Sequence, residues 1–470
     1  MRQPTADGWT FTPPPRLLAA GGWLLCAALA IIALGAGAVL GVGLVERFSL
    51  TGIGALLVWL GMAALVLRDG TWRAVAAAVA VSLVLRWASA DLAHGVALGA
   101  DPMNYTNLAR AVLDGRGLVT DDWQYGQGLR AYFPPFYPLV LAGWWGLAGQ
   151  SIASTLVLHT AMDGLAAWAL ADAARRLGVS TAAARAAGLL CFAWPAFALG
   201  AGLPQKESLT VLLVLLMLRA MAVWLMADAA EARRWRHGLQ IGLWWGMLAL
   251  TQASLALAPG FVALVLLAQR GFGPVVRLGL TALPALLLVL VPWWIRNWLL
   301  FDAFVPLTTA SGMMANASLG SFRVPFPPGL FDLPEPERGA IMGALARDRL
   351  LTEPATALSE MGGAMVLGFA YEEASLARFR HTTPPIDAAA HGRLAFVLQG
   401  SWFVLLASAA VAGWRGLRRG LADPLAILAL VLLLAILAIN PWFEFGERHR
   451  LVLTPLLLVM AAGIWVRARR

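Results

Sequence analysis

The stretch KESLTVLLVLLMLRAMAVWLM, residues 206–226, contains an apolar run long enough to cross a lipid bilayer as a helix. Similar runs recur along the 470-residue chain, in which 60% of the residues are hydrophobic and only 13% are charged. A water-soluble domain has too little interior to bury so much apolar surface. Alternating strands of about ten residues, which are typical of a membrane β-barrel, are not seen. The sequence therefore predicts an all-α polytopic membrane protein.

Short basic or Gly/Pro-rich stretches separate the runs, which predict a bundle of about 12–13 transmembrane helices. Basic residues gather at the ends of runs, for example at Arg68, Arg175, Arg233 and Arg415. This positive-inside pattern predicts that both termini are cytoplasmic. It also accounts for the net charge of +9 without nucleic acid as a partner. The predicted helices are 17–44, 49–67, 73–93, 135–149, 151–174, 182–200, 206–226, 238–253, 254–269, 278–299, 394–414, 424–440 and 450–466.

Two more polar segments predict loops on the periplasmic side, and we expect the second loop, with helical periodicity around 336–379, to pack over the first. The runs 135–149 and 151–174 make an even number of crossings where the charge pattern needs an odd number. Either one of them is re-entrant or the charge rule fails locally. The expected division is N-terminal membrane helices 1–93, first periplasmic loop 94–134, central membrane helices 135–300, second periplasmic loop 301–393 and C-terminal membrane helices 394–470.

The first loop opens with ADPMNYTNLARAVLDGRGL, residues 100–118. Asp101 is a suitable N-cap and Pro102 a suitable first helical residue. Apolar residues from Tyr105 to Leu113 follow helical spacing, and Gly115 is a typical helix stop. The stretch predicts a short amphipathic helix at the membrane surface, in which Asp101 acts as a cap, as a general base, or as both.

Other common chemistries find little support in the sequence. Cys26 and Cys191 both fall inside apolar runs, which favours small buried hydrophobes over a disulfide. The six histidines lack the spacing of metal ligands, so no cofactor and no metal site are predicted. A divalent ion held by loop carboxylates stays open as an alternative. We find no Walker A loop and no Rossmann glycine fingerprint, which argues against nucleotide hydrolysis and a nucleotide-sugar donor.

Six stretches, in the same order, resemble the GT-C superfamily of membrane glycosyltransferases, which includes the protein mannosyltransferases and the bacterial aminoarabinose transferase. The sequence departs from that pattern at Pro102, where many relatives carry a second acid, at Gln252 and Ala253, which replace Arg-Pro, and at His449, which replaces Tyr. The matching stretches are DPMNYTNLARAVLDGRG (101–117), PPFYPLVLAGWWGLAG (134–149), LPQKESLTVLLVLLML (203–218), GMLALTQASLALAPG (246–260), VPWWIRNWLLFDAFVPLTTASG (291–312) and ERHRLVLTPLLLVMAA (447–462).

The resemblance implies a hexosyl- or pentosyltransferase that moves a sugar, with inversion, from a polyprenyl-phosphate donor to a lipid, glycan or protein acceptor. It places the enzyme in the bacterial inner membrane with its active site on the periplasmic side. Asp101 is the candidate catalytic base, since a carboxylate can take the acceptor's proton. Asp121 and Asp122 are the reserve bases, with a solvated turn as their alternative role.

Cations must neutralise the phosphate as it leaves, and arginine suits phosphate oxygens best. Each candidate also has a structural explanation: Lys206 as an ion pair with Glu207, Arg296 as an interfacial anchor, and Arg448 and Arg450 as salt-bridge partners of Glu444 and Glu447. The candidate phosphate-binding residues are Arg296, Arg448, Arg450 and Lys206, with Tyr105, Glu207 and Tyr137 as supporting residues.

Two other function classes compete with the enzyme. A secondary transporter or lipid flippase needs ionisable residues inside the membrane, and Asp163 and Asp172 are the only hints of these. A non-catalytic assembly subunit needs no functional loop. Most ionisable residues lie at the predicted outer ends of the helices, which favours the enzyme.

Overall fold

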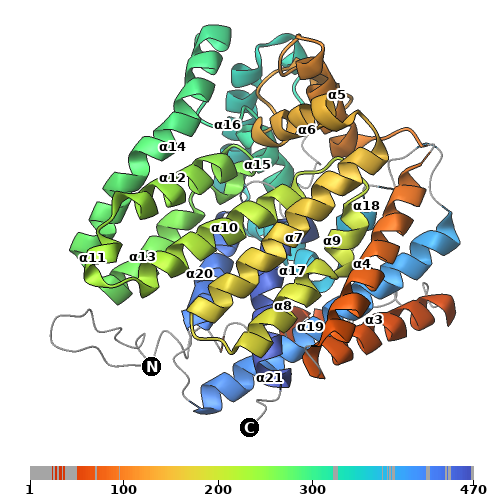
Figure 1. The fold of residues 1–470 in the computed structure, drawn as a ribbon. Coiled ribbons are helices and arrows are strands. Elements are labelled where there is room, and N and C mark those ends of the chain that lie inside the picture. Colours follow the sequence, from red (N-terminus) through yellow and green to blue (C-terminus); the bar gives the residue numbers. More distant parts are fainter. Residues whose placement is uncertain are drawn as a thin grey trace.

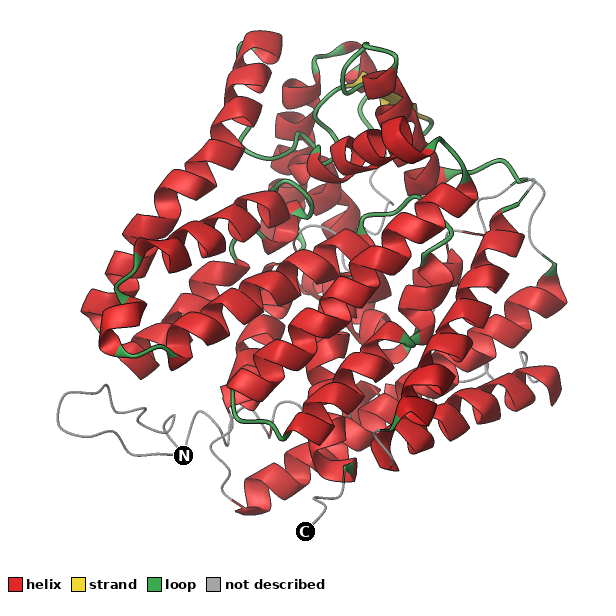
Figure 2. Ribbon diagram, in the orientation of Figure 1, coloured by secondary structure: helices red, strands yellow, loops and turns green. Residues whose placement is uncertain are grey.

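A computed structural model describes residues 50–68, 71–94, 96–320, 326–372, 374–377, 379, 383, 387–419, 424–439, 442 and 446–466, with a few residues between 24 and 36. Within these ranges the chain is almost entirely helical, which confirms the predicted all-α polytopic membrane protein. In the described residues, the strands β1 (Thr120–Asp122) and β2 (Gly126–Leu129) pair as a two-stranded antiparallel hairpin. Figure 2 shows this hairpin at one end of the helical bundle.

The helices follow the chain in the order shown in Figure 1. They are α3 (Leu50–Arg68), α4 (Trp72–Ala93), α5 (Ala100–Leu113), α6 (Phe136–Ala148), α7 (Ile152–Arg176), α8 (Thr181–Phe192), α9 (Pro195–Gly200), α10 (Glu207–Met226), α11 (Ala229–Ala232), α12 (Trp235–Ala249), η1 (Ala253–Leu255), α13 (Ala258–Arg270), α14 (Phe272–Phe301), α15 (Ser311–Gly320), η2 (Leu330–Asp332), α16 (Glu335–Thr352), α17 (Pro354–Ala370), α18 (Ala374–Ala377), α19 (Ala388–Arg419), α20 (Pro424–Ile439), η5 (Glu447–Leu453) and α21 (Thr454–Trp465).

Seven of the described helical segments are long and apolar enough to cross a membrane. Other spans among the 12–13 that the sequence predicts correspond, within the described residues, to helices that are shorter or less apolar. For example, α12 has 15 residues and α13 has 13. The predicted helix 17–44 lies mostly outside the described residues. The seven segments are Leu50–Arg68, Trp72–Ala93, Thr181–Gly200, Glu207–Met226, Phe272–Phe301, Ala388–Arg418 and Glu447–Trp465.

The lengths of α6 and α7 bear on the odd number of crossings that the charge pattern requires. The 13 residues of α6 extend about 20 Å, which is too short for a hydrocarbon core of about 30 Å. The 25 residues of α7 extend about 37 Å, which is long enough. By length α7 is the better candidate for the crossing, yet it is not among the seven segments that are both long and apolar enough. The 13-residue α6 is too short to cross.

The centre of the bundle is formed by α8 to α10, and its outside by helices such as α3 and α4. In Glu207–Met226, 78% of the apolar window is buried, compared with 28% in α3 and in α4. Apolar side chains such as Leu57, Trp87 and Leu288 are more than half exposed. Lipid would cover such side chains, since a helix that is apolar on all sides must be surrounded by apolar material.

A glycine stripe brings α12 close to α14. Gly238, Gly242 and Gly246 recur every fourth residue on α12, and a Cβ atom at Gly242 would collide with the backbone carbonyl of Ala282 on α14. Small residues at this spacing allow close helix packing in membranes. The contact positions the end of α12, which leads to Gln252.

The two predicted loops pack together at one end of the bundle, where α5, α6, α15 and α16 gather in Figure 1. The buried Glu335 carboxylate on α16 accepts hydrogen bonds from the backbone N–H groups of Arg130 and Ala131, the latter at 3.1 Å, and from the Thr309 hydroxyl at 2.8 Å. Beside it, Leu129 and Tyr132 share a hydrophobic cluster with residues of the second loop such as Met342. This confirms the expected packing. The second loop is largely helical, and α19 begins before the expected boundary at 394.

Candidate active site

Asp101 does not cap its helix. The N-cap of α5 is Gly99, and Asp101 lies in the first turn. The expected cap is therefore wrong, because the helix begins at Ala100 rather than at Pro102. Ala100 has φ = +50°, a left-handed conformation that is costly for a residue with a Cβ atom. Such strain is typical of functional sites, where surrounding structure holds it in place. The end of α5 is confirmed, since Asp114 is the C-cap and Gly115 has φ = +73°.

The Asp101 carboxylate forms an ion pair with Arg448 of η5, which is 347 residues away in the sequence. The two side chains are 22% and 17% exposed, so the pair is partly shielded but accessible. The structure thus brings the candidate base into contact with one of the candidate phosphate-binding cations.

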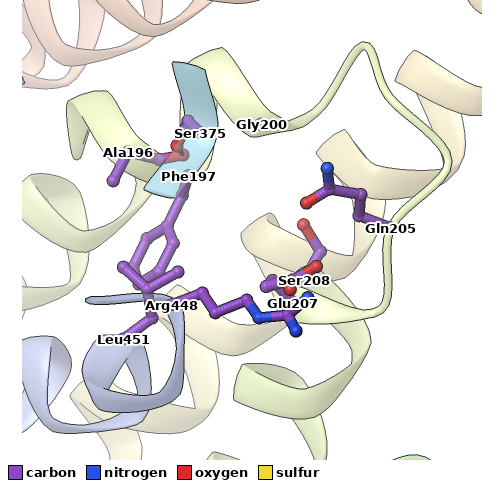
Figure 3. A pocket seen from close by; sticks show the side chains of 9 residues that line it. All are labelled: Ala196, Phe197, Gly200, Gln205, Glu207, Ser208, Ser375, Arg448 and Leu451. Carbon is purple, nitrogen blue, oxygen red and sulfur yellow. Dashed lines mark hydrogen bonds between the residues drawn. The ribbon is translucent and has the colours of Figure 1, made fainter. Parts of the chain in front are cut away.

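Arg448 lies between two hollows, which share Arg448, Glu207 and Leu451. The first, called here the polar hollow, has a volume of about 350 Å³. In Figure 3 the Arg448 side chain extends across it towards Glu207 and Ser208, and Gln205 reaches in from the opposite side. Its lining residues are Ala196, Phe197, Gly200, Gln205, Glu207, Ser208, Ser375, Arg448 and Leu451.

The second, the bridging hollow, has a volume of about 320 Å³ and shares Leu255 with a third, apolar hollow of about 500 Å³, both volumes including space open to solvent. The apolar hollow is lined by residues of α10, α12, η1, α13, α20 and α21, and its lining side chains are all apolar. A charged mouth at Arg448 therefore adjoins a hollow suited to a hydrocarbon chain. The bridging hollow is lined by Glu207, Thr210, Val211, Gln252, Leu255, Arg448, His449, Leu451 and Val452.

The loop between α9 and α10, which carries Gln205 and Lys206 and leads to Glu207 at the start of α10, is held by buried polar contacts. The Tyr137 hydroxyl lies 3.0 Å from His159 Nε2 and against the backbone of Gln205. His159 Nδ1 lies 3.0 Å from the Ala201 carbonyl oxygen. The Tyr105 ring on α5 packs edge-on against Tyr137 with 5.1 Å between centroids. Tyr105 and Tyr137 thus connect α5 to this loop, and the supporting role in the site stays a prediction.

The reserve bases Asp121 and Asp122 lie on the β-hairpin in different environments. Asp122 is buried and accepts hydrogen bonds from Asn104 and from the backbone N–H groups of Gln124 and Tyr125. Asp121 is exposed and accepts from the Gly128 N–H at 2.7 Å. Asp122 is therefore not in a solvated turn, since it fastens the hairpin to α5.

The other predicted cations have different surroundings from Arg448. Arg296 lies over the Trp293 ring and donates to Asn297 at 2.8 Å and to the Leu118 carbonyl oxygen at 3.3 Å. Lys206 directly precedes α10, next to two residues that line the polar hollow. The phosphate role of both stays a prediction.

Arg450 is fully buried and is held by the structure around it. It pairs with Glu372 at 2.9 Å, donates to the backbone carbonyls of Gly368 and Tyr371, and lies over the Trp402 ring. Burial raises the pKa of the Glu372 carboxyl, and the neighbouring Arg450 opposes that rise. These contacts fit a structural role better than a phosphate site.

Some charged residues come together in ways that the sequence does not reveal. Arg86 on α4 and Asp163 on α7 form a buried ion pair at 2.8 Å. At the other end of α7, Asp172 pairs with Arg175, Arg176 and Arg219. In the described ranges, no group of three or more His, Cys, Asp or Glu side chains is placed to hold a metal ion. Cys191 is free and buried, and Cys26 lies outside the described residues.

Comparisons with known proteins match this chain through its structure alone. No family model and no curated protein sequence matches. An archaeal oligosaccharyltransferase, AglB from Archaeoglobus fulgidus in complex with an inhibitory peptide and a dolichol-phosphate, matches with TM-score 0.49 and 14% identity over 82% of this chain and 50% of that chain. ArnT from Cupriavidus metallidurans bound to undecaprenyl phosphate matches with TM-score 0.42 and 20% identity over 82% and 77%.

A further A. fulgidus oligosaccharyltransferase structure, a complex with Zn and sulfate, matches with TM-score 0.48 and 13% identity over 81% of this chain and 48% of that chain. The present chain thus spans about half the length of the oligosaccharyltransferases it matches. These proteins are of the kind that the sequence resemblance names. At such TM-scores, function is inferred from the residues of this chain.

Proposed function

We propose that this protein is a membrane glycosyltransferase that transfers a sugar, with inversion, from a polyprenyl-phosphate donor to an acceptor hydroxyl or amine. The observation that carries the proposal is the Asp101–Arg448 pair, whose arginine lines the polar hollow and the bridging hollow, the second of which shares Leu255 with the apolar hollow. This arrangement supplies an acid–base group, a cation for phosphate and an apolar place for the lipid tail. A lipid, a glycan and a protein all remain candidate acceptors.

In the proposed reaction, the acceptor attacks the anomeric carbon of the sugar and its proton passes to the Asp101 carboxylate. The bond between that carbon and the phosphate oxygen breaks, and its electron pair stays on the phosphate. Arg448 neutralises the phosphate with its planar guanidinium. In the free protein, Asp101 is the partner of Arg448. A donor phosphate would compete for the guanidinium and leave the carboxylate to the acceptor.

We place this site on the periplasmic side of a bacterial inner membrane. Glu207, at the start of α10, lines the polar hollow, and α10 has 20 residues, which extend about 30 Å. That length equals the hydrocarbon core of a bilayer, about 30 Å. Beyond the other end of α10 lie Arg233, Arg234 and Arg236, as is typical of the cytoplasmic side.

A lipid flippase or secondary transporter is the second candidate, because the buried Arg86–Asp163 pair lies among apolar helices. Arg86 also donates to Ser82 on its own helix at 3.2 Å, so the pair is fixed by local contacts. The enzyme is favoured because the accessible charged pair, Asp101–Arg448, lies at the hollows instead.

Filling the apolar hollow tests the donor class. Val262 on α13 lines this hollow, whereas Leu264 on the same helix is 63% exposed. We expect Val262→Trp to weaken undecaprenyl phosphate binding about tenfold or more, because each lost CH₂ contact costs about 0.8 kcal/mol and 1.4 kcal/mol is a factor of ten. Leu264→Trp is the matched control and should bind as the wild type does. Native mass spectrometry with added undecaprenyl phosphate measures both. Equal binding by Val262→Trp and wild type would contradict the assigned tail site.

A further inference from the structure

The polar hollow differs in chemistry from the bridging hollow on the other side of Arg448. Of these two hollows, only the bridging hollow shares a lining residue, Leu255, with the apolar hollow. The polar hollow is lined instead by Gln205, Glu207, Ser208 and Ser375 among apolar residues. A phosphate held by Arg448 would therefore have the bridging hollow, which adjoins the apolar hollow, on one side and the polar hollow on the other.

Two polar atoms of residues that line the polar hollow are buried without a hydrogen-bond partner among the described residues. They are Nε2 of Gln205, whose residue is only 7% exposed, and Oε2 of Glu207. Both residues line the polar hollow, and the Gln205 amide points into it in Figure 3. A buried polar group without a partner costs about 1–3 kcal/mol, so such atoms call for an explanation. A bound ligand that completes their hydrogen bonds explains both.

Buried contacts hold the neighbours of Gln205 and Glu207 in place around the polar hollow. Ser208, which follows Glu207, lies against the Asp163 carboxylate, which Arg86 fixes at 2.8 Å. The backbone of Gln205 is held by Tyr137. Gly202, three residues before Gln205 in the loop, donates its N–H to the Ser89 hydroxyl at 3.0 Å. Residues whose neighbours are fixed in this way are preorganised for binding.

The two atoms without a partner indicate which hydrogen-bonding groups the ligand must carry. The Gln205 amide N–H needs an acceptor and the Glu207 carboxylate needs a donor. A hydroxyl group supplies both, whereas a second phosphate would be repelled by Glu207. The hollow measures at most about 350 Å³, a volume that includes space open to solvent, so it limits the occupant to a small ring rather than an oligosaccharide.

We propose that Gln205 and Glu207 bind the hydroxyl groups of the donor's single sugar ring in the polar hollow and so determine which sugar the protein accepts. This inference rests on the proposed function, since it takes the donor phosphate to lie at Arg448. It assigns the two residues to sugar selection, while Asp101 and Arg448 act on the reacting atoms.

Native mass spectrometry with four lipids tests the inference: undecaprenyl phosphate and its glucosyl, mannosyl and arabinosyl esters. We expect wild type to bind at least one ester more tightly than undecaprenyl phosphate. Gln205→Leu and Glu207→Gln should each weaken binding of that ester about 10- to 100-fold, as expected for a hydrogen bond to a charged or buried group. Gln205→Leu should leave binding of undecaprenyl phosphate unchanged, and Glu207→Gln should leave it unchanged or tighten it, because Glu207 also lines the bridging hollow and its charge opposes a phosphate. Thr210→Val, in the bridging hollow on the same helix, should keep the preference for the ester.

The thermal stability of the lipid-free Gln205→Leu protein separates binding from a structural role. Because Nε2 has no partner among the described residues, its loss should leave the melting temperature unchanged or raise it. A large fall would overturn the inference, as would a preference for the ester that survives both substitutions, or no preference for any ester. If wild type binds none of the four lipids, the proposed function fails and the inference fails with it.

Discussion

Asp101→Asn is expected to lower glycosyl transfer by about 10²–10⁴-fold, the usual contribution of a positioned general base. Asparagine keeps the size of the side chain but cannot take the acceptor's proton. It also removes the charge that competes for Arg448, so the variant should bind undecaprenyl phosphate at least as tightly as wild type. Turnover in proteoliposomes and lipid binding by native mass spectrometry measure the two effects separately.

Asp121→Asn is the matched control, because Asp121 is an exposed acid of the same loop. It should retain turnover within about twofold, since its carboxylate accepts from the exposed Gly128 N–H and surface changes of this kind are usually worth less than 0.5 kcal/mol. Near wild-type turnover in Asp101→Asn would contradict its role as the base. A large loss in Asp121→Asn together with that result would move the base to the hairpin.

Arg448→Gln is expected to weaken donor binding about 10- to 100-fold, since hydrogen bonds to charged groups contribute about 1.5–3 kcal/mol. Turnover should fall further, because the phosphate gains charge as the sugar leaves. Arg448→Lys should recover part of the binding but not the bidentate geometry of arginine. Titration with undecaprenyl phosphate, followed by turnover at saturating donor, separates the two losses.

The control for Arg448 is Arg116→Gln, because Arg116 is 58% exposed and pairs with Asp114 at the surface. Exposed pairs of this kind contribute little, so binding and turnover should stay unchanged. If Arg448→Gln bound undecaprenyl phosphate as tightly as wild type, the phosphate would have to lie elsewhere, with Arg296 as the next residue to test.

Features that depend on local spacing could be predicted from the sequence. The helix around Tyr105 and its stop at Gly115 follow from neighbouring residues, and so does the α10 span. Helix starts are harder to predict: Pro102 suits a first helical position, which favours Asp101 as the cap, yet the helix begins at Ala100. The lengths of single helices are also hard to predict, because hydropathy alone does not show that a run such as 254–269 is divided between η1 and the 13-residue α13.

The site depends on contacts between distant parts of the chain, which no spacing rule reveals. Asp101 and Arg448 were each candidates, but their pairing joins two ends of the sequence. Arg450 looked equivalent to Arg448, although only the structure shows it buried against Glu372. Gln205 carried no signal beyond its place beside Lys206 and Glu207. Its importance appears only once its burial and partnerless amide are known.

The fate of the donor in sealed proteoliposomes tests the central claim most directly. The purified protein would be supplied with polyprenyl-phosphate glycosides and acceptor-containing envelope lipids, both extracted from membranes that lack it. Liquid chromatography and mass spectrometry would then follow the intact glycosides and free polyprenyl phosphate. We predict that wild type consumes a glycoside and releases an equal amount of polyprenyl phosphate, and that Asp101→Asn does not. Movement of intact glycosides between leaflets, with no release of polyprenyl phosphate, would contradict the glycosyltransferase and favour a flippase.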